Sequence, residues 1–75
     1  MSGYLEPPTS FDRHVGRCLR ASRMALGLSL AEAGTLAGVH TMSLQSWETG
    51  RRTCPLETLI ALAAFYRARV TDFLP

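Results

Sequence analysis

Apolar residues recur every three or four positions along most of the chain, which is the spacing of one buried face of an α-helix. The first such stripe, over residues 11–26, consists of Phe11, Val15, Cys18, Leu19, Ser22 and Leu26. A later stripe, which follows Pro55, consists of Leu56, Leu59, Ile60, Leu62, Ala63 and Tyr66. No run of alternating apolar and polar residues is long enough for a strand. The pattern therefore predicts an all-α fold.

Capping residues divide the middle of the chain into two short helices. Ser29 is a candidate N-cap, and Glu32 three residues later completes a capping box for a helix over residues 30–37. Gly38 ends this helix because glycine adopts the positive φ angle of a helix C-terminus without a clash. A third helix follows, which begins at His40 or the next residue and runs to about residue 49.

The length of the chain, 75 residues, allows one hydrophobic core and no second domain. Residues 1–10 contain glycine and two prolines without a helical period, so we expect a flexible N-terminal arm that ends at Ser10, the N-cap of the first helix. Residues 11–75 then form one domain. With a fourth helix over 55–67 and a last turn over 70–74, the sequence predicts five short helices.

Two short helices joined by a glycine-containing turn, over residues 30–49, meet the steric demands of a helix-turn-helix. Val39 fills the corner of the turn, and Leu44 and Trp47 give the third helix one inward face. The inward face of the second helix consists of Ala33, Leu36 and Ala37. The opposite face is polar and uncharged, with hydroxyl, amide and thioether groups that suit contact with base edges. A polar helix face in water would have the same composition. The residues of this face are Thr41, Met42, Ser43, Gln45 and Ser46.

Composition and charge exclude several functions. The net charge is +2, and all eight basic residues are arginines, which suit phosphate and guanine but also occur in proteins of GC-rich genomes. The two cysteines have no partner at metal-ligand spacing, and we expect Cys18 to point inward, away from His14. We find no catalytic set, cofactor fingerprint, secretory signal or membrane-length apolar run. The expected protein is thus cytoplasmic and not an enzyme, with no cofactor, metal or evident small-molecule ligand.

Residues spread over most of the chain keep the spacing of a known family without gaps. They are Val15-Gly16, Leu19-Arg20, Arg23, Gly27-Leu28-Ser29, Leu36-Ala37-Gly38-Val39, Leu44, Trp47-Glu48, Gly50-Arg51-Arg52, Pro55, Leu59, Leu62-Ala63, Val70 and Asp72-Phe73-Leu74. In these positions the chain resembles the Cro/phage-repressor type of helix-turn-helix protein, the xenobiotic-response-element family. The resemblance implies a five-helix repressor-like DNA-binding bundle, with residues 41–48 as the recognition helix in the major groove.

The resemblance also implies roles for individual residues. The base-reading positions are Thr41, Met42, Gln45 and Ser46. The resemblance places Arg51 and Arg52 in the loop that meets the DNA backbone. Hydrogen-bond donors on their side chains or backbone add Ser29, Ser43 and Arg20 as further phosphate-binding candidates. Arg23 and Glu48 match a buried ion pair that ties the first helix to the third, and the helical phase of Arg23, four residues after Leu19, supports this pairing.

Three positions depart from the family. Leu30 stands where a glutamine often contacts phosphate, so that contact is expected to be absent, although backbone N–H groups near Ser29 could replace it. Gly34 replaces a usual alanine, which either permits closer packing or loosens the motif. His40 replaces the usual serine or threonine cap, so we expect the third helix to start less sharply.

These features predict a sequence-specific DNA-binding transcriptional regulator of bacterial or phage type, a repressor or autoregulatory controller. It would bind double-stranded operator DNA as a homodimer. The resemblance places the dimer surface at the loop before the fourth helix and the turn near Phe73-Leu74. The alternative is an antitoxin-like or adaptor module that binds proteins on the same fold.

Overall fold

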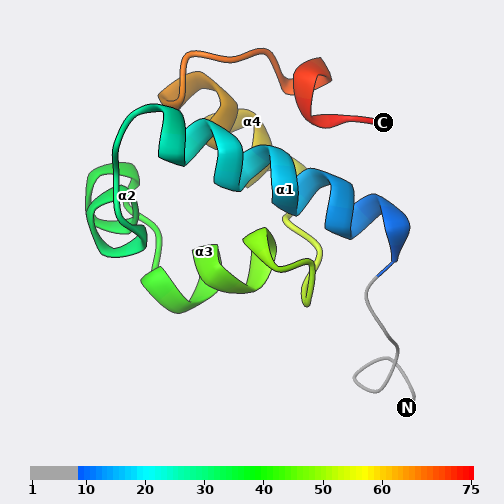
Figure 1. Cartoon of the computed structure of the whole chain (residues 1–75), viewed down its shortest axis with the longest axis horizontal. Coiled ribbons are helices and arrows are strands. Elements are labelled where there is room, and N and C mark those ends of the chain that lie inside the picture. Colours follow the sequence, from blue (N-terminus) through cyan, green and yellow to red (C-terminus); the bar gives the residue numbers. More distant parts are fainter. Residues whose placement is uncertain (1–8) are drawn as a thin grey trace.

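The computed structural model describes residues 9–75, which form four α-helices and one short 3-10 helix (Figure 1). In chain order these elements are α1 (Ser10–Ala25), α2 (Leu30–Ala37), α3 (Thr41–Glu48), α4 (Leu56–Phe65) and η2 (Val70–Phe73). No strand occurs in residues 9–75, so the prediction of an all-α fold is confirmed. The expected fifth α-helix is wrong, because η2 is a single 3-10 turn. Leu74, which precedes Pro75, is already extended, as residues before proline prefer to be.

Local capping chemistry sets the ends of α1 and α2. Thr9, not Ser10, caps α1, since its hydroxyl accepts a hydrogen bond from the Asp12 N–H at 3.0 Å. The predicted arm therefore overlaps the described chain only at these two residues, and the rest of it lies outside the described part. The capping box of α2 is confirmed: the Ser29 N–H donates to the Glu32 carboxylate at 2.8 Å, and the Glu32 N–H donates to the Ser29 hydroxyl at 3.0 Å. These bonds hold the pKa of Glu32 below its ordinary value.

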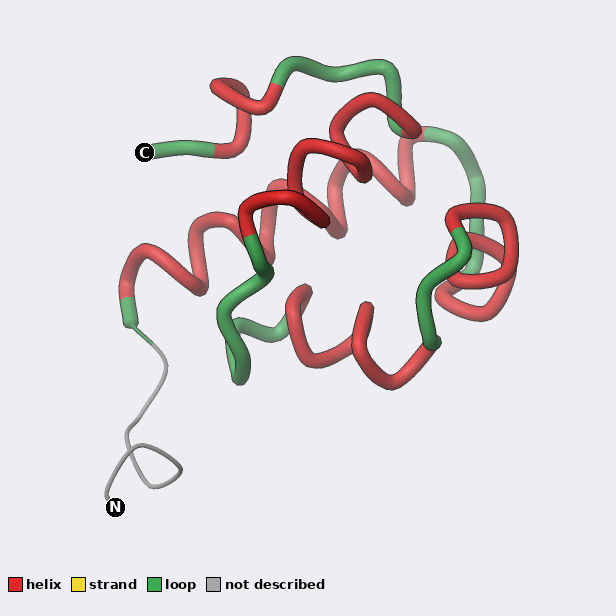
Figure 2. Tube along the Cα trace, turned by 180° about the vertical axis from the view of Figure 1, so that it is seen from behind, coloured by secondary structure: helices red, strands yellow, loops and turns green. Residues whose placement is uncertain are grey.

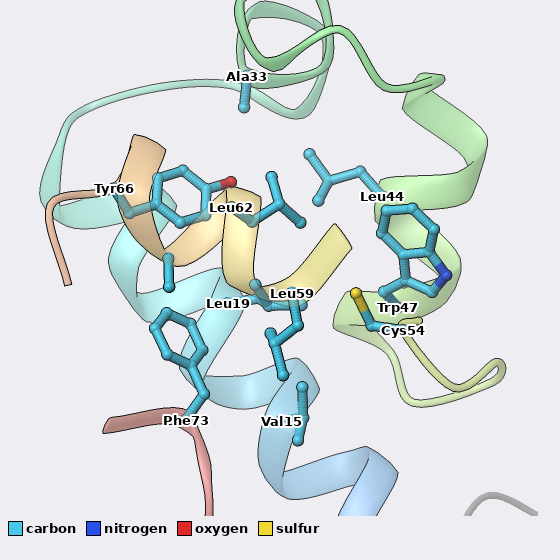
Figure 3. Close-up of a cluster of buried hydrophobic side chains, with 11 residues drawn as sticks. Val15, Leu19, Ala33, Leu44, Trp47, Cys54, Leu59, Leu62, Tyr66 and Phe73 are labelled. Atoms are coloured by element: carbon cyan, nitrogen blue, oxygen red, sulfur yellow. The ribbon is translucent and has the colours of Figure 1, made fainter. Parts of the chain in front are cut away.

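The helices pack around α1, the longest element. In Figure 1, α3 lies below α1 and α2 lies at one end, where it joins the two. α4 lies behind α1 in Figure 1 and therefore in front of it in Figure 2, which shows the molecule from the other side. α1 contacts α3 and η2, and α2 contacts α3. The core between these elements, shown in Figure 3, consists of Val15, Leu19, Ala33, Leu44, Trp47, Cys54, Leu59, Leu62, Ala63, Tyr66 and Phe73.

Several residues that the periodicity assigns to the core are exposed. Phe11 and Leu26, at the two ends of the α1 stripe, are about half exposed, and so is Ile60 on α4; Leu36 and Leu56 are exposed by 63% and 66%. Each of these residues lies at the end or flank of a helix. There the apolar stripe of the helix extends beyond the surface that neighbouring elements cover, so the residue stays exposed. The other residues of the α4 stripe, Leu59, Leu62, Ala63 and Tyr66, are buried as predicted.

Close approach of α1 to α3 depends on Gly16. A Cβ atom at this position would collide with the carbonyl oxygens of Trp47 and Glu48, so any other residue would force the two helices apart. The position of α3 is therefore fixed by backbone contact with α1 as well as by side chains. No helix in residues 9–75 is long and apolar enough to span a lipid bilayer.

Candidate nucleic-acid interface

The turn between α2 and α3 is compact and sets the direction of α3. Gly38 has a φ of +74°, and the Val39 N–H donates to the Gly34 carbonyl at 2.9 Å. A Cβ atom at Gly34 would lie 2.9 Å from the Val39 oxygen, so the glycine permits close packing rather than loosening the motif. His40 caps α3, because its Nδ1 accepts the Met42 N–H at 3.1 Å. The expected loss of a sharp helix start is therefore wrong, since the imidazole replaces a hydroxyl as acceptor.

Leu30 does not face outward as a contact residue would. Its side chain is half-buried and packs against the hydrophobic core. The substitution of an apolar residue at this position thus strengthens the attachment of α2 to the bundle. Nearby, the Ser29 N–H is already bonded to the Glu32 carboxylate, so the backbone group expected to replace the lost contact is occupied.

α3 has one inward and one outward face. Leu44 and Trp47 are buried, whereas Met42 and Gln45 are exposed, Met42 by 62%. The remaining polar residues of the helix, Thr41, Ser43 and Ser46, are half-buried at the borders of this outward face. The outward face of α3 is uncharged along its whole length.

A hollow of about 330 Å³ lies at the C-terminal part of this face. Its lining consists of Met42, Gln45, Ser46, Thr49 and Arg51. The Thr49 hydroxyl bonds to the helix carbonyl oxygens of Gln45, at 3.0 Å, and Ser46, at 3.2 Å. The structure thus brings three of the four expected base-reading residues and one expected phosphate ligand to one concave surface.

The other candidate phosphate ligands lie apart from this hollow. Arg52 is exposed in the loop after α3, and its N–H donates to the Ser46 carbonyl at 3.3 Å, which ties the loop to the helix end. Arg20 is exposed on α1, and Ser29 is exposed at the start of α2. Ser43 is half-buried on α3. These four residues thus lie on α1, α2, α3 and the loop after α3 and do not line the hollow.

An ion pair between Arg23 and Glu48 supports α3 from behind. Arg23 Nε and Nη2 donate to the two oxygens of Glu48 at 2.8 and 2.9 Å, and Nη1 donates to the Leu28 carbonyl at 2.7 Å. The side chains are only 10% and 4% exposed. The hydrogen bond to Glu48 raises the pKa of Arg23 above its ordinary value. One guanidinium therefore joins α1, the turn before α2 and the last residue of α3.

The sequence predicts that Tyr66 lies in the core, but it does not predict that the buried hydroxyl lies near the charge of Glu48. Its ring points into the core, as Figure 3 shows, and its hydroxyl has no hydrogen-bond partner among residues 9–75. Burial and the negative charge of Glu48 both raise the pKa of this hydroxyl. The tyrosine at the end of the predicted core stripe is the sequence signal, because a buried tyrosine hydroxyl usually has a hydrogen-bond partner.

The expected separation of Cys18 and His14 is wrong. Cys18 is half-buried, and its Sγ lies 3.6 Å from His14 Nε2, one turn earlier on α1. The spacing of four residues places both side chains on one helix face, and the flank of the core stripe leaves them accessible. Among residues 9–75 there is no group of three or more His, Cys, Asp or Glu residues that could hold a metal ion.

Cys54 is buried in the same core cluster as Trp47, as Figure 3 shows, and burial raises the pKa of its thiol to about 11.

Solved structures of regulators resemble this chain over most of its length. The DNA-binding domain of BldD from S. venezulae has 30% identity and a TM-score of 0.82, covering 89% of this chain and 100% of that one. The restriction-modification controller protein C.AhdI from Aeromonas hydrophila has 25% identity and a TM-score of 0.77, covering 84% and 96%. The biofilm master regulator SinR, solved in complex with DNA, has 28% identity and a TM-score of 0.73, covering 79% and 95%.

Comparison with curated protein sequences gives no match. The family described as helix-turn-helix domain matches residues 14–73, which include α2, the glycine turn, α3 and the ion pair that supports it. Two of the similar solved structures named above are of a controller protein, C.AhdI, and a master regulator, SinR. This chain belongs to the helix-turn-helix family of DNA-binding transcriptional regulators.

Proposed function

We propose that this chain is a sequence-specific transcriptional regulator, a repressor or autoregulatory controller, that binds operator DNA in the cytoplasm as a homodimer. The observation that carries the proposal is the uncharged outward face of α3, which ends beside Arg51. Neutral polar groups can bond to base edges in the major groove, while arginines outside the face neutralise phosphates. The structure of SinR, which was solved in complex with DNA, supports the same use of the fold.

In this proposal Thr41, Met42, Gln45 and Ser46 contact bases. Gln45 is exposed and carries both a donor and an acceptor, so it can pair with both N6 and N7 of an adenine. Such a bidentate pair is worth about 1–3 kcal/mol of discrimination against another base.

Phosphate contacts in this proposal come from the arginines and serines around α3. Arg51 and Arg52 would bind phosphates on one side, with Ser43 between them and the bases. Arg20 and Ser29 would bind the backbone on the side of α1 and α2. The Arg23–Glu48 pair contacts no DNA and holds α3 in register.

The outer flank of α4 supports the homodimer. Leu56 is exposed by 66%, Ile60 by 50% and Leu74 by 40%, in the loop-proximal and C-terminal regions that the family resemblance assigns to the dimer surface. A second copy would remove these side chains from water. In sedimentation experiments we expect Leu56→Ser with Ile60→Ser to give a monomer. The matched control Leu36→Ser, at a side chain 63% exposed on α2, should leave the dimer intact.

In vitro selection of bound duplexes from a random pool tests the function directly. We expect a palindrome whose half-sites are one helical turn apart, bound at least about a thousandfold more tightly than random DNA at physiological salt. Gln45→Ala should change the selected sequence, whereas Arg51→Gln should weaken all sequences alike. Equal affinity for selected and random DNA would exclude sequence-specific regulation.

A second candidate function is a protein-interaction module, either antitoxin-like or an adaptor. It is favoured by a mainly apolar hollow of about 390 Å³ on α2, lined by Leu28, Ala31, Glu32, Thr35 and Leu36. This hollow is separate from the outward face of α3. If the folded chain enriches no duplex, this second function replaces the first.

A further inference from the structure

We propose that Met42 reads the C5-methyl group of a pyrimidine, so that the protein distinguishes thymine or 5-methylcytosine from the corresponding unmethylated base. The inference rests on the proposed function, since it requires α3 to lie in the major groove. It adds the chemical identity of one group that the outward face of α3 recognises.

Met42 is the exposed apolar residue of α3. Its side chain is 62% exposed, whereas the other large apolar residues of the helix, Leu44 and Trp47, are buried in the core. A thioether is polarisable and flexible, so it adapts to a small apolar partner. The C5-methyl is the apolar group that a pyrimidine presents in the major groove. Neighbouring Thr41 is less suited to this role, because its hydroxyl lies beside Gly34 and the side chain is half-buried.

The residues that line the hollow beside Met42 are complementary in polarity to the groups of one nucleotide. Its lining combines an apolar thioether residue, Met42, a neutral amide residue, Gln45, and a cationic residue, Arg51, and it contains no carboxylate. The Thr49 hydroxyl is already bonded to the helix carbonyls of Gln45 and Ser46. A methylated pyrimidine nucleotide presents an apolar methyl, a polar base edge and an anionic phosphate. The lining of the hollow therefore contains a partner of suitable polarity or charge for each of these three groups.

The expected effect follows from the burial of one methyl group. Removing one methyl from water favours binding about fourfold in Kd, which corresponds to about 0.8 kcal/mol. In a homodimer on a palindrome, the same group is read once in each half-site. Changing both half-sites should then multiply the effect to about sixteenfold.

The experiment uses variants of the selected duplex in which the C5-methyl group of one pyrimidine at a time is removed or added. Each thymine in turn is replaced by deoxyuridine, and each cytosine by 5-methylcytosine, and Kd is measured by fluorescence anisotropy at one salt concentration. At one pyrimidine per half-site we expect loss of the methyl to weaken binding about fourfold, or its addition to strengthen binding about fourfold. Met42→Ala should abolish this dependence without a change in melting temperature, because the side chain is exposed. Met24→Ala, at a methionine 53% exposed on α1, should retain it.

Two results would overturn the inference while leaving the proposed function intact. One is tight binding of the selected duplex with no response to the methyl at any pyrimidine. The other is a methyl response that persists unchanged in Met42→Ala. If no duplex is enriched at all, the proposed function fails first, and the inference about Met42 fails with it.

Discussion

Removing the carboxylate of Glu48 should strongly destabilise the fold. In Glu48→Ala the Arg23 guanidinium loses two hydrogen bonds, of 2.8 and 2.9 Å, and keeps the one to the Leu28 carbonyl. Its side chain is 10% exposed, so water cannot replace the lost partner. Breaking a buried pair in this way costs about 3–5 kcal/mol. A domain of this length has a free energy of unfolding of about 4–11 kcal/mol, so the variant loses a large share of it.

Thermal and urea unfolding, followed by far-UV circular dichroism, measures this loss. At about 4–8 °C per kcal/mol, we expect the melting temperature of Glu48→Ala to fall by roughly 12–40 °C. Glu48→Gln keeps one acceptor and should fall between this variant and the wild type. The matched control is Arg69→Gln, which removes the exposed bridge of 3.5 Å to Asp72 and should cost less than about 1 kcal/mol.

A double replacement distinguishes the charge from the packing. Arg23→Met with Glu48→Leu removes both charges and leaves apolar side chains of similar length. It should recover most of the stability that Glu48→Ala loses, because no unpaired charge remains buried. An unchanged melting temperature in Glu48→Ala would refute the reasoning, since it would mean that Arg23 is not held by this carboxylate in solution.

Three further predictions concern other parts of the molecule. Gly16→Ala should destabilise the fold by about 1–3 kcal/mol in urea unfolding, since the new methyl collides with the Trp47 carbonyl. Burial raises the pKa of Cys54 from 9.0 to about 11, so the unfolded state loses its proton first. Stability is therefore complete below pH 9 and falls as pH rises towards 11, by at most about 2 kcal/mol in the urea midpoint. Arg51→Gln should reduce the slope of log K against log salt by about one, without changing the preferred sequence.

Each of these measurements has its own control. Gly27→Ala, at a φ of +71° with open space around it, separates backbone strain of about 1 kcal/mol from the collision at Gly16. Cys54→Ala should make the alkaline slope shallower without removing it, because burial also raises the pKa of Tyr66; an identical slope in this variant would contradict the assignment. Arg69→Gln should leave the salt slope unchanged, and a loss equal to that of Arg51→Gln would assign the effect to net charge alone.

Local chemistry made α2 predictable to the residue. The Ser29–Glu32 capping box and the positive φ of Gly38 act within one turn of the chain, so no tertiary information is needed. The start of α1 was misplaced by one residue because Thr9 and Ser10 are both good caps. The hydrogen bond between the Thr9 hydroxyl and the Asp12 N–H decides between them.

Periodicity was less informative about the width of each buried face. It assigns Leu36, Leu56 and Ile60 to the core because they are apolar and correctly spaced. Their exposure depends on how many neighbours each helix has, which is a property of the assembled bundle. The pairing of Cys18 with His14 was missed for the same reason, since an inward direction was assumed for a residue on the flank of α1.

The candidate site also contains one feature that the sequence predicts, the ion pair, and one that it does not predict, the hollow. Arg23 and Glu48 are 25 residues apart, yet helical phase and family resemblance together pointed to them, because each stands at the border of a buried stripe. The hollow between Met42 and Arg51 could not be predicted, since it depends on how the loop after α3 folds back on the helix. The bond from the Arg52 N–H to the Ser46 carbonyl holds that loop in place.

The support of α3 from behind has a consequence for the evolution of the domain. Gly16, Arg23 and Glu48 hold the helix through its backbone and its inward face, and the exposed side chains of Met42 and Gln45 contribute little to the core. Substitutions at these two positions are therefore nearly free of a stability cost. A duplicated copy of this domain could acquire a new target sequence by a few changes on α3, without compensating mutations elsewhere in the bundle.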